Sequence, residues 1–315
     1  MKTKKTPITA VAMLATVGLY AAPISIDTVV IGNANNPADT RTTAEGGTPG
    51  LGRVSYEYNI GTTAVTAGQY TAFLNAVATT GDTHGLYNVN MVDNVNGCGI
   101  TANTVGGVTT YTATKGDNMP VNYVSVYDAM RFCNWLTTGN TEVGVYMFSG
   151  TDSVAQITRN STYWTAGAGG VAVASLDEWY KAAFYQGDGT YSMYANGTNT
   201  APTGTEANFS ASGIGSITDV DFGVASYYNT FGQNGNVWEW AETISSGSNL
   251  YIRGGSFTNS AANLAASYST NFEATVESNI IGFRVVSLQA IPEPSTYAAI
   301  FGALALALVA YRRRK

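Results

Sequence analysis

The stretch Gly235-Asn236-Val237-Trp238-Glu239-Trp240 sets one carboxylate between two tryptophans in a chain of 315 residues. Tryptophan removes a large apolar area from water on folding, so both indoles are expected in the core. Glu239 then either accepts hydrogen bonds from nearby backbone amides or supplies oxygen to a metal ion. These six residues alone leave both interpretations open.

Upstream of this stretch, three segments begin with a side chain that can cap a helix and continue with apolar residues on one face. Each segment therefore predicts a short helix packed against the core on one side. The caps are Thr66 with Gln69, Ser125 with Asp128, and Ser175 with Glu178. The predicted inward faces are Tyr70, Phe73, Leu74 and Val77; Ala129, Phe132, Cys133 and Leu136; and Leu176, Trp179, Tyr180 and Ala183.

The rest of the chain has short strand patterns and many loops. Strands are predicted over residues 53–60, 250–252 and 282–288. Gly- and Thr-rich segments, such as residues 46–50 and 101–114, are expected to be loops. Few regular elements and long connections predict a single irregular α+β domain over residues 23–290.

Residues 1–22 have the three parts of a secretory signal peptide. Three lysines among the first five residues supply a positive start, residues 8–19 are mostly apolar, and Ala21-Ala22 offers small side chains for cleavage. The apolar run is too short to cross a bilayer. The pattern therefore predicts an export signal rather than an anchor.

Residues 291–315 combine Pro292-Glu293-Pro294, an apolar run over residues 297–311, and Arg312-Arg313-Arg314-Lys315. The run predicts a short transmembrane helix, and the arginines mark its cytoplasmic end. This order resembles the PEP-CTERM sorting tail of Gram-negative bacteria that produce exopolysaccharide. The resemblance implies a transient anchor, which an exosortase recognises and removes near the Pro-Glu-Pro motif.

Charge and composition exclude several classes of protein. Seven of the fifteen basic residues lie at the two ends, which leaves eight in the rest of the chain against twenty-one acidic residues. Such a chain cannot replace the counterions of phosphate, so no nucleic acid partner is expected. With one histidine and two cysteines, it cannot build a histidine-rich or four-cysteine metal site.

The hexapeptide at residues 235–240 is one of six motifs along residues 54–288. The others are Val65-Thr66-Ala67-Gly68-Gln69-Tyr70, Met119-Pro120-Val121 with Phe132-Cys133-Asn134-Trp135-Leu136, Leu176-Asp177-Glu178-Trp179, Arg253-Gly254-Gly255-Ser256-Phe257 and Gly282-Phe283-Arg284-Val285. Together they resemble the formylglycine-generating-enzyme, or sulfatase-modifying-factor, family. The resemblance implies the C-type-lectin-like fold, with small antiparallel sheets and long ordered loops.

The same resemblance bears on catalysis. Active members of the family oxidise a substrate cysteine with two cysteines of their own and a copper ion, and Asn259 and Leu264 stand at those two positions. Neither an amide nor an alkyl side chain can replace a thiolate ligand and nucleophile. The chain is therefore predicted to lack catalysis and copper. The alternative is a formylglycine-generating oxidoreductase that acts on protein cysteine.

Cys98 and Cys133 do not occupy the family's catalytic positions. Cys133 falls on the inward face of a predicted helix, which favours a buried thiol. A Cys98–Cys133 disulfide formed after export is the alternative. His84 lies in a turn between Gly81 and Gly85 and is expected to be a solvated loop residue.

The family also binds structural calcium near the hexapeptide, through carboxylate and carbonyl oxygens. Carried over, one site would use the Glu239 carboxylate with the Gly235 and Val237 carbonyls. Gly232 stands where a side-chain oxygen is usual, which weakens that site. The other set comprises Asn208, the Phe209 carbonyl, and Asp219 or Asp221, and the sequence does not choose between the aspartates.

Residues 258–281 lie where active relatives place their chemistry, and they are rich in small polar residues and tyrosine. Such side chains suit adaptable surface contacts, although a plain solvated loop is the alternative. The hypothesis is an exported protein of the cell surface or extracellular matrix whose domain binds exopolysaccharide or another surface ligand. The candidate ligand-binding residues are Asn259, Asn263, Tyr268 and Asn271.

Overall fold

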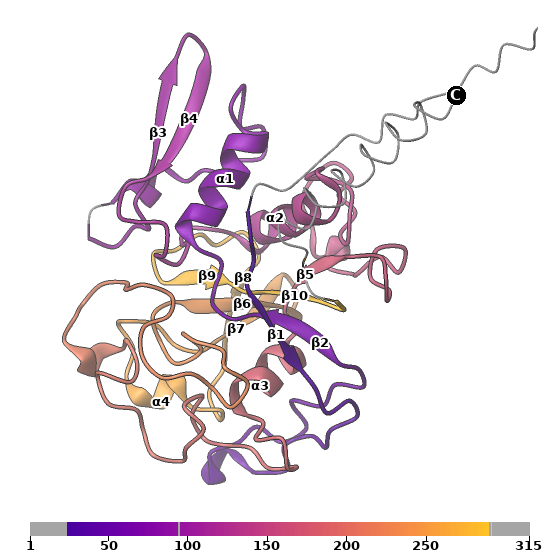
Figure 1. Ribbon diagram of the computed structural model, residues 1–315, viewed down its shortest axis with the longest axis vertical. Helices are drawn as coiled ribbons and strands as arrows, with labels where there is room; N and C mark the ends of the chain where they lie inside the picture. The colour runs from indigo at the N-terminus through magenta and orange to yellow at the C-terminus, as the bar shows by residue number, and fades with distance from the viewer. Residues whose placement is uncertain (1–23, 94, 290, 292–315) are drawn as a thin grey trace, which may run out of the picture.

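The computed structural model describes residues 24–93, 95–289 and 291. These residues form three small sheets and a few helices, connected by long loops (Figure 1). Within the described ranges no helix is both long and apolar enough to span a bilayer. The predicted signal peptide lies outside them, as do the predicted span over residues 297–311 and the sorting residues Pro292, Glu293, Pro294, Arg312, Arg313 and Arg314.

The first sheet has four antiparallel strands in the order β1-β2-β10-β5. They are β1 (Thr28–Ile31), β2 (Tyr58–Gly61), β10 (Val285–Ser287) and β5 (Val171–Val173). The register pairs Ile60 with Val29 on one side and with Val286 on the other. The first and last strands of the domain are thereby joined in one sheet.

The second sheet has the order β8-β7-β6-β9, with β6 and β9 parallel and the other pairs antiparallel. Its strands are β6 (Trp238–Ser246), β7 (Asn249–Arg253), β8 (Thr270–Glu273) and β9 (Ile281–Phe283). Arg284 alone separates β9 from β10, so one residue connects the two sheets. This junction places the hexapeptide at the centre of the domain.

The three capped helices are confirmed. They are α1 (Ala67–Val77), α2 (Val126–Thr138) and α3 (Leu176–Phe184), and each begins after the capping box that the sequence predicts. A fourth, α4, spans Ala261–Leu264. The 3-10 helices are η1 (Thr43–Glu45), η2 (Val89–Val92), η3 (Val154–Gln156) and η4 (Ser210–Ser212).

Aromatic rings join α1 and α2 to the sheet junction. The Phe73 ring packs edge-on against Phe132, with centroids 5.5 Å apart, and Phe132 packs edge-on against Phe283 of β9 at the same distance. Edge-on pairs of this kind add stability beyond the apolar area they bury. α1 and α2 therefore pack on the core through the inward faces that the sequence predicts.

One strand prediction and one loop prediction need correction. Of residues 53–60, only Tyr58 to Ile60 lie in a strand, because the Asn36 side chain bonds the Gly52 carbonyl and the Val54 amide in place of a strand partner. Residues 101–114, expected to be a loop, form most of a hairpin of β3 (Ile100–Val105) and β4 (Val108–Ala113). Gly106 and Gly107 turn it with φ values of +60° and +83°, as a tight hairpin turn requires.

Candidate functional site

Glu239 is held by a buried arginine in the centre of the domain. It is 1% exposed. Arg284 donates from Nε to Glu239 Oε2 at 2.9 Å and from Nη2 to Oε1 at 2.8 Å. The Trp179 indole N–H donates to Oε2 at 2.7 Å. Both carboxylate oxygens therefore have strong donors, and one of these comes from α3, far away in sequence.

Arg284 reaches Glu239 because it stands between β9 and β10. Its guanidinium is fully buried, and it also donates to the Gly61 carbonyl at 2.7 Å and the Phe231 carbonyl at 2.5 Å. Pairing and satisfied hydrogen bonds offset much of the free-energy cost of burying a charge. Here the pair meets both conditions, so the hexapeptide carboxylate acts as a structural anchor.

This geometry bears on the predicted calcium site at Glu239, Gly235 and Val237. A calcium ion there would have to displace Arg284, which already supplies the compensating positive charge. Gly235 lies so close to the neighbouring loop that a Cβ would approach the Asn208 carbonyl oxygen to 2.1 Å. The residues around Glu239 thus fit an ion pair better than an oxygen shell, and their use of calcium stays a prediction.

The other predicted calcium residues lie on the loop that precedes the hexapeptide. Asn208 Oδ1 accepts one hydrogen bond, from Ser212 Oγ at 3.1 Å, and Phe209 is buried. Asp219 and Asp221 are both exposed. Within the described residues no three acidic, cysteine or histidine side chains gather closely enough to hold a metal. A site here would depend on amide and carbonyl oxygens.

Asp221, but not Asp219, lines a cavity of about 730 Å³. The cavity lies between the segment around β1, the first turn of α1 and the loop at Asp221, and Asp27 and Asp117 also line it. None of the four predicted ligand-binding residues contributes to its wall. The cavity is thus separate from the predicted ligand segment, and the choice between Asp219 and Asp221 as a calcium ligand stays open.

Asn259 and Leu264 have structural contacts at the two positions where the resemblance places cysteines. Asn259 Oδ1 accepts from the Ser256 amide at 2.9 Å and from Ser256 Oγ at 2.6 Å, which closes the turn after Gly254-Gly255. Leu264 is 1% exposed, in a small apolar cluster apart from the main core. The other buried members of that cluster are Tyr194, Ala207, Phe209 and Ala265.

Of the four predicted ligand-binding residues, Tyr268 and Asn271 face solvent. Tyr268 is 37% exposed, and its ring lies against Trp238 with centroids 6.0 Å apart. Asn271 is exposed on β8. Asn263 instead accepts hydrogen bonds from the Ser260 amide and hydroxyl, which caps α4. The side chains of Asn259 and Asn263 are therefore already hydrogen-bonded within the segment.

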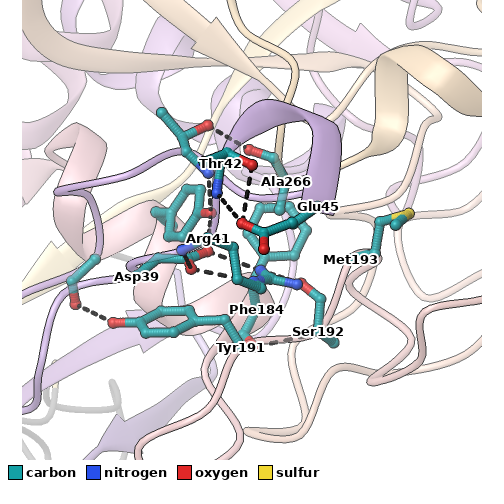
Figure 2. Close-up of polar contacts among 12 residues, drawn as sticks. Asp39, Arg41, Thr42, Glu45, Phe184, Tyr191, Ser192, Met193 and Ala266 are labelled. Atoms are coloured by element: carbon teal, nitrogen blue, oxygen red, sulfur yellow. Dashed lines mark hydrogen bonds and ion pairs between the residues drawn. The ribbon is translucent and has the colours of Figure 1, made fainter.

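A segment from the N-terminal part of the chain lies against this region (Figure 2). Thr48 Oγ1 donates to the Ala266 carbonyl at 2.7 Å. Figure 2 shows Arg41 between Asp39 and Ser192: it donates to the Asp39 carboxylate at 2.7 Å and to the Ser192 carbonyl at 3.0 Å. Although burial alone would raise the pKa of Asp39, hydrogen bonds from Arg41 and a tyrosine hold it below its usual value.

Arg253, at the end of β7, is a buried cation with no carboxylate partner among the described residues. It donates to the Ala266 carbonyl at 2.9 Å and to the Tyr268 carbonyl, and its guanidinium lies 5.1 Å from the Tyr180 ring centroid. Burial lowers the pKa of Arg253 to about 10. The sequence motif includes this arginine. No sequence pattern reveals that its guanidinium binds the backbone carbonyls of the predicted ligand segment.

A second buried ionic network is also invisible in the sequence. Arg159 donates to Glu178 at 2.9 Å and 2.6 Å, and its Nε forms an ion pair with Glu242 Oε1 at 2.5 Å. Tyr146 donates its hydroxyl hydrogen to Glu242. Burial and the nearby Glu178 raise the pKa of Glu242 to about 7, against the opposing effect of Arg159. Two carboxylates thus share one arginine.

Cys98 and Cys133 are free thiols and fully buried. Burial raises the pKa of both, which keeps them protonated and unreactive. The buried thiol predicted for Cys133 is confirmed, and the alternative disulfide is not formed. His84 is an exposed loop residue as predicted, with Nε2 3.4 Å from Glu142 Oε1.

Comparisons with known proteins agree with the fold. Crystallised CarF superposes with a TM-score of 0.58 at 22% identity, covering 83% of this chain and 98% of CarF. Variable protein 1 of Treponema denticola gives a TM-score of 0.54 at 21% identity, covering 83% of this chain and 95% of that protein. Identities this low show the fold alone. No curated protein matches the chain.

A family match covers nearly all of the described domain. Residues 28–288 match the family model of the sulfatase-modifying factor enzyme 1-like domain, a range that contains all six motifs. The predicted α+β, C-type-lectin-like architecture is confirmed. The chain therefore belongs to the sulfatase-modifying factor enzyme 1-like family.

Proposed function

We propose that this chain is an exported surface or matrix protein whose domain binds a ligand without catalysing a reaction. The observation that carries the proposal is the use of the two cysteine positions. Asn259 closes the turn at Ser256, and Leu264 fills an apolar cluster. Both positions serve the packing of the segment, and the two thiols elsewhere in the chain are buried.

Copper-dependent oxidation of a cysteine-containing sulfatase peptide separates this proposal from the alternative oxidoreductase. We expect the purified chain to leave the peptide thiol at the level of a copper-only control, while an active formylglycine-generating enzyme converts it. Formation of the aldehyde above that control, detected by mass spectrometry, would overturn the proposal.

The proposed ligand surface is the exposed part of the segment, at Tyr268 and Asn271. A partly exposed ring and an exposed amide in the same segment suit stacking and hydrogen bonding to sugar hydroxyls, which supports exopolysaccharide as the ligand. Arg253 and Thr48 hold the Ala266 carbonyl and so restrain the backbone next to this surface. A restrained backbone lowers the entropy lost on binding.

Glycan-array binding tests this surface. We expect Tyr268→Ala and Asn271→Ala each to reduce binding at least about fivefold, since each removes a direct contact. Tyr227→Ala is the matched control, because Tyr227 is 54% exposed and lies outside the segment. Equal binding by all three variants would remove the assignment.

Export and sorting are proposed from the ends of the chain. We expect the native protein to lack residues 1–22 and the apolar tail, with the domain recovered from the cell surface or the medium. Mass spectrometry after cell fractionation measures this directly. A mature protein that retains Arg312, Arg313 and Arg314 would contradict exosortase processing.

Calcium remains a proposal for Asn208, Phe209 and Asp219 or Asp221. The exposure of both aspartates and an Asn208 amide oxygen that has one donor support it. Removal of calcium with EDTA should lower the melting temperature, and Asp219→Asn and Asp221→Asn show which aspartate contributes. A melting temperature that neither EDTA nor added calcium changes would count against the site.

A further inference from the structure

The β3–β4 hairpin projects from the domain beside α1 (Figure 1). Its strands pair without interruption from Ile100 opposite Ala113 to Val105 opposite Val108. No charged residue and no proline occur between Ile100 and Ala113. The hairpin is thus an uninterrupted, uncharged ribbon. The backbone groups along its two outer edges need either partners or solvent.

The β4 edge of this ribbon is covered by α1 and the residues after it. The Asn75 side chain donates to the Tyr111 carbonyl and accepts from the Tyr111 amide, both at 2.9 Å. The Thr109 amide donates to the Thr79 carbonyl at 2.8 Å. The backbone groups of Tyr111 and Thr109 therefore point away from β3 and have partners.

The β3 edge is open in its outer part. Tyr111 lies opposite Ala102, and Thr109 lies opposite Thr104. In an antiparallel pair, residues that face each other direct their backbone groups either both inward or both outward. Ala102 and Thr104 must then point theirs away from β4. At the base Tyr87 Oη donates to the Ile100 carbonyl, but among the described residues nothing bonds the Thr104 amide or carbonyl.

Exposed valines flank this open edge. Val105 is 71% exposed and Val108 49% at the tip, while Val89 is 70% exposed and Val92 45% in η2, which lies beside β3. Proteins usually protect an edge strand with charge, proline or a bulge, because an open edge recruits other strands. This edge has none of those devices and has apolar surface beside it.

We propose that β3 docks against β3 of a second copy of this chain, as antiparallel strands about a two-fold axis. With Thr104 on the axis, Thr104 faces Thr104 of the second copy, so a charge at this position would meet a like charge. The whole chain carries a formal charge of -6, yet β3 is neutral. A neutral β3 adds no like-charge repulsion to the pairing of two acidic chains, whereas a basic partner would favour an acidic strand.

The result would be a continuous four-stranded sheet that joins two domains through their hairpins. This inference goes beyond ligand binding and does not depend on it. A dimer of this kind carries two copies of the Tyr268 surface, so it would bind a repetitive polymer more tightly than one domain does.

Sedimentation equilibrium of the full chain tests the proposal, with Thr104→Lys and Thr112→Lys as a matched pair. Both residues are exposed on the same hairpin, but Thr112 lies on β4. We expect Thr104→Lys to weaken self-association about tenfold or more, since two lysines then meet across the axis. Thr112→Lys should leave the dissociation constant within about twofold of the wild-type value.

Thr104→Pro gives a second variant that removes the outward N–H without adding charge, a change that an edge strand tolerates. It should also weaken the dimer, with a melting temperature close to that of Thr112→Lys. A wild-type chain that stays monomeric at about 100 μM, near the weak end of specific association, would overturn the proposal. So would equal association by Thr104→Lys and Thr112→Lys. A monomer that loses lipid or protein binding on Thr104→Lys would assign the edge to that partner instead.

Discussion

The Glu239–Arg284 pair and the segment from Ser256 to Asn271 are neighbours in the fold, yet sequence change affects them differently. The pair joins β6 to the junction of β9 and β10, is fully buried, and has further partners in Trp179 of α3 and Gly61 of β2. The segment combines short-range contacts, such as Asn259 with Ser256, with neutral hydrogen bonds from Thr48 and Arg253 to its backbone carbonyls. Family membership is therefore recognisable in the buried pair, whereas Asn259 and Leu264 in the segment have structural contacts of their own.

The largest effect is expected at the pair itself. Glu239→Gln leaves the Arg284 charge buried without an anion, and we expect it to lower the free energy of unfolding by about 3–5 kcal/mol. Urea denaturation measures the change. Glu273→Gln, on the exposed face of β8, is the control and should stay within about 0.5 kcal/mol of the wild-type value. Similar losses for the two variants would remove the contrast between buried and exposed carboxylates.

The next effect tests whether Leu264 belongs to the core. Leu264→Ala should cost about 2–4 kcal/mol, because it opens a cavity in the apolar cluster around Phe209. Thr258→Ala, an exposed change in the same segment, should be close to neutral. A Leu264→Ala variant as stable as Thr258→Ala would show that this position packs against nothing essential.

Arg159 contrasts with Arg284, because Arg159 is shared by two carboxylates whereas Arg284 pairs with one. The folded-state pKa of Glu242, about 7, lies above its ordinary value of 4.5, so its stabilising contribution is complete below pH 4.5. That contribution is lost as pH rises through about 7. Stability should therefore fall over this window by roughly 3 kcal/mol from this group.

Glu242→Gln removes the titrating group and should flatten that decline. Denaturation at several pH values between 4.5 and 8 measures it, and Glu273→Gln should keep the wild-type slope. Asp128, whose pKa burial also raises to about 7, maintains part of the decline in every variant. An unchanged slope in Glu242→Gln would contradict the role given to this carboxyl.

The smallest effect separates two asparagines of one segment. Asn259→Ala removes the acceptor that closes the Ser256 turn and should cost about 1 kcal/mol, as a lost cap does. Asn271→Ala changes an exposed side chain and should cost less than about 0.5 kcal/mol. Thermal denaturation resolves the two, and a reversed order would mean that Asn271 is the structural residue.

The sequence predicts the parts of this fold that local chemistry determines. Thr66, Ser125 and Ser175 each cap a helix as expected, since a capping box acts within four residues. The family motifs likewise lead to the buried centre at Glu239. What they do not show is its partner in space, because Arg284 and Trp179 reach Glu239 from distant segments.

The hairpin was mispredicted for a different reason. Residues 101–114 are rich in Thr and Gly, a composition that loops and exposed strands share. The signal that favours a hairpin is Gly106-Gly107 between Val105 and Val108, with β-branched threonines on both sides. The sequence does not predict the structural roles of Arg253 and Arg159. A buried guanidinium is recognised only by the carbonyls and carboxylates that the fold brings to it.

The two buried thiols can serve as probes of local opening in the folded protein. Cys133 lies in the middle of α2, whereas Cys98 lies just before β3, at the base of the hairpin. A thiol reagent can reach either one only when the structure around it opens, so labelling rates convert into local opening free energies. In Cys133→Ala, the labelling rate of Cys98 would measure local opening at the base of the hairpin. In Cys98→Ala, the labelling rate of Cys133 would measure opening of the main core.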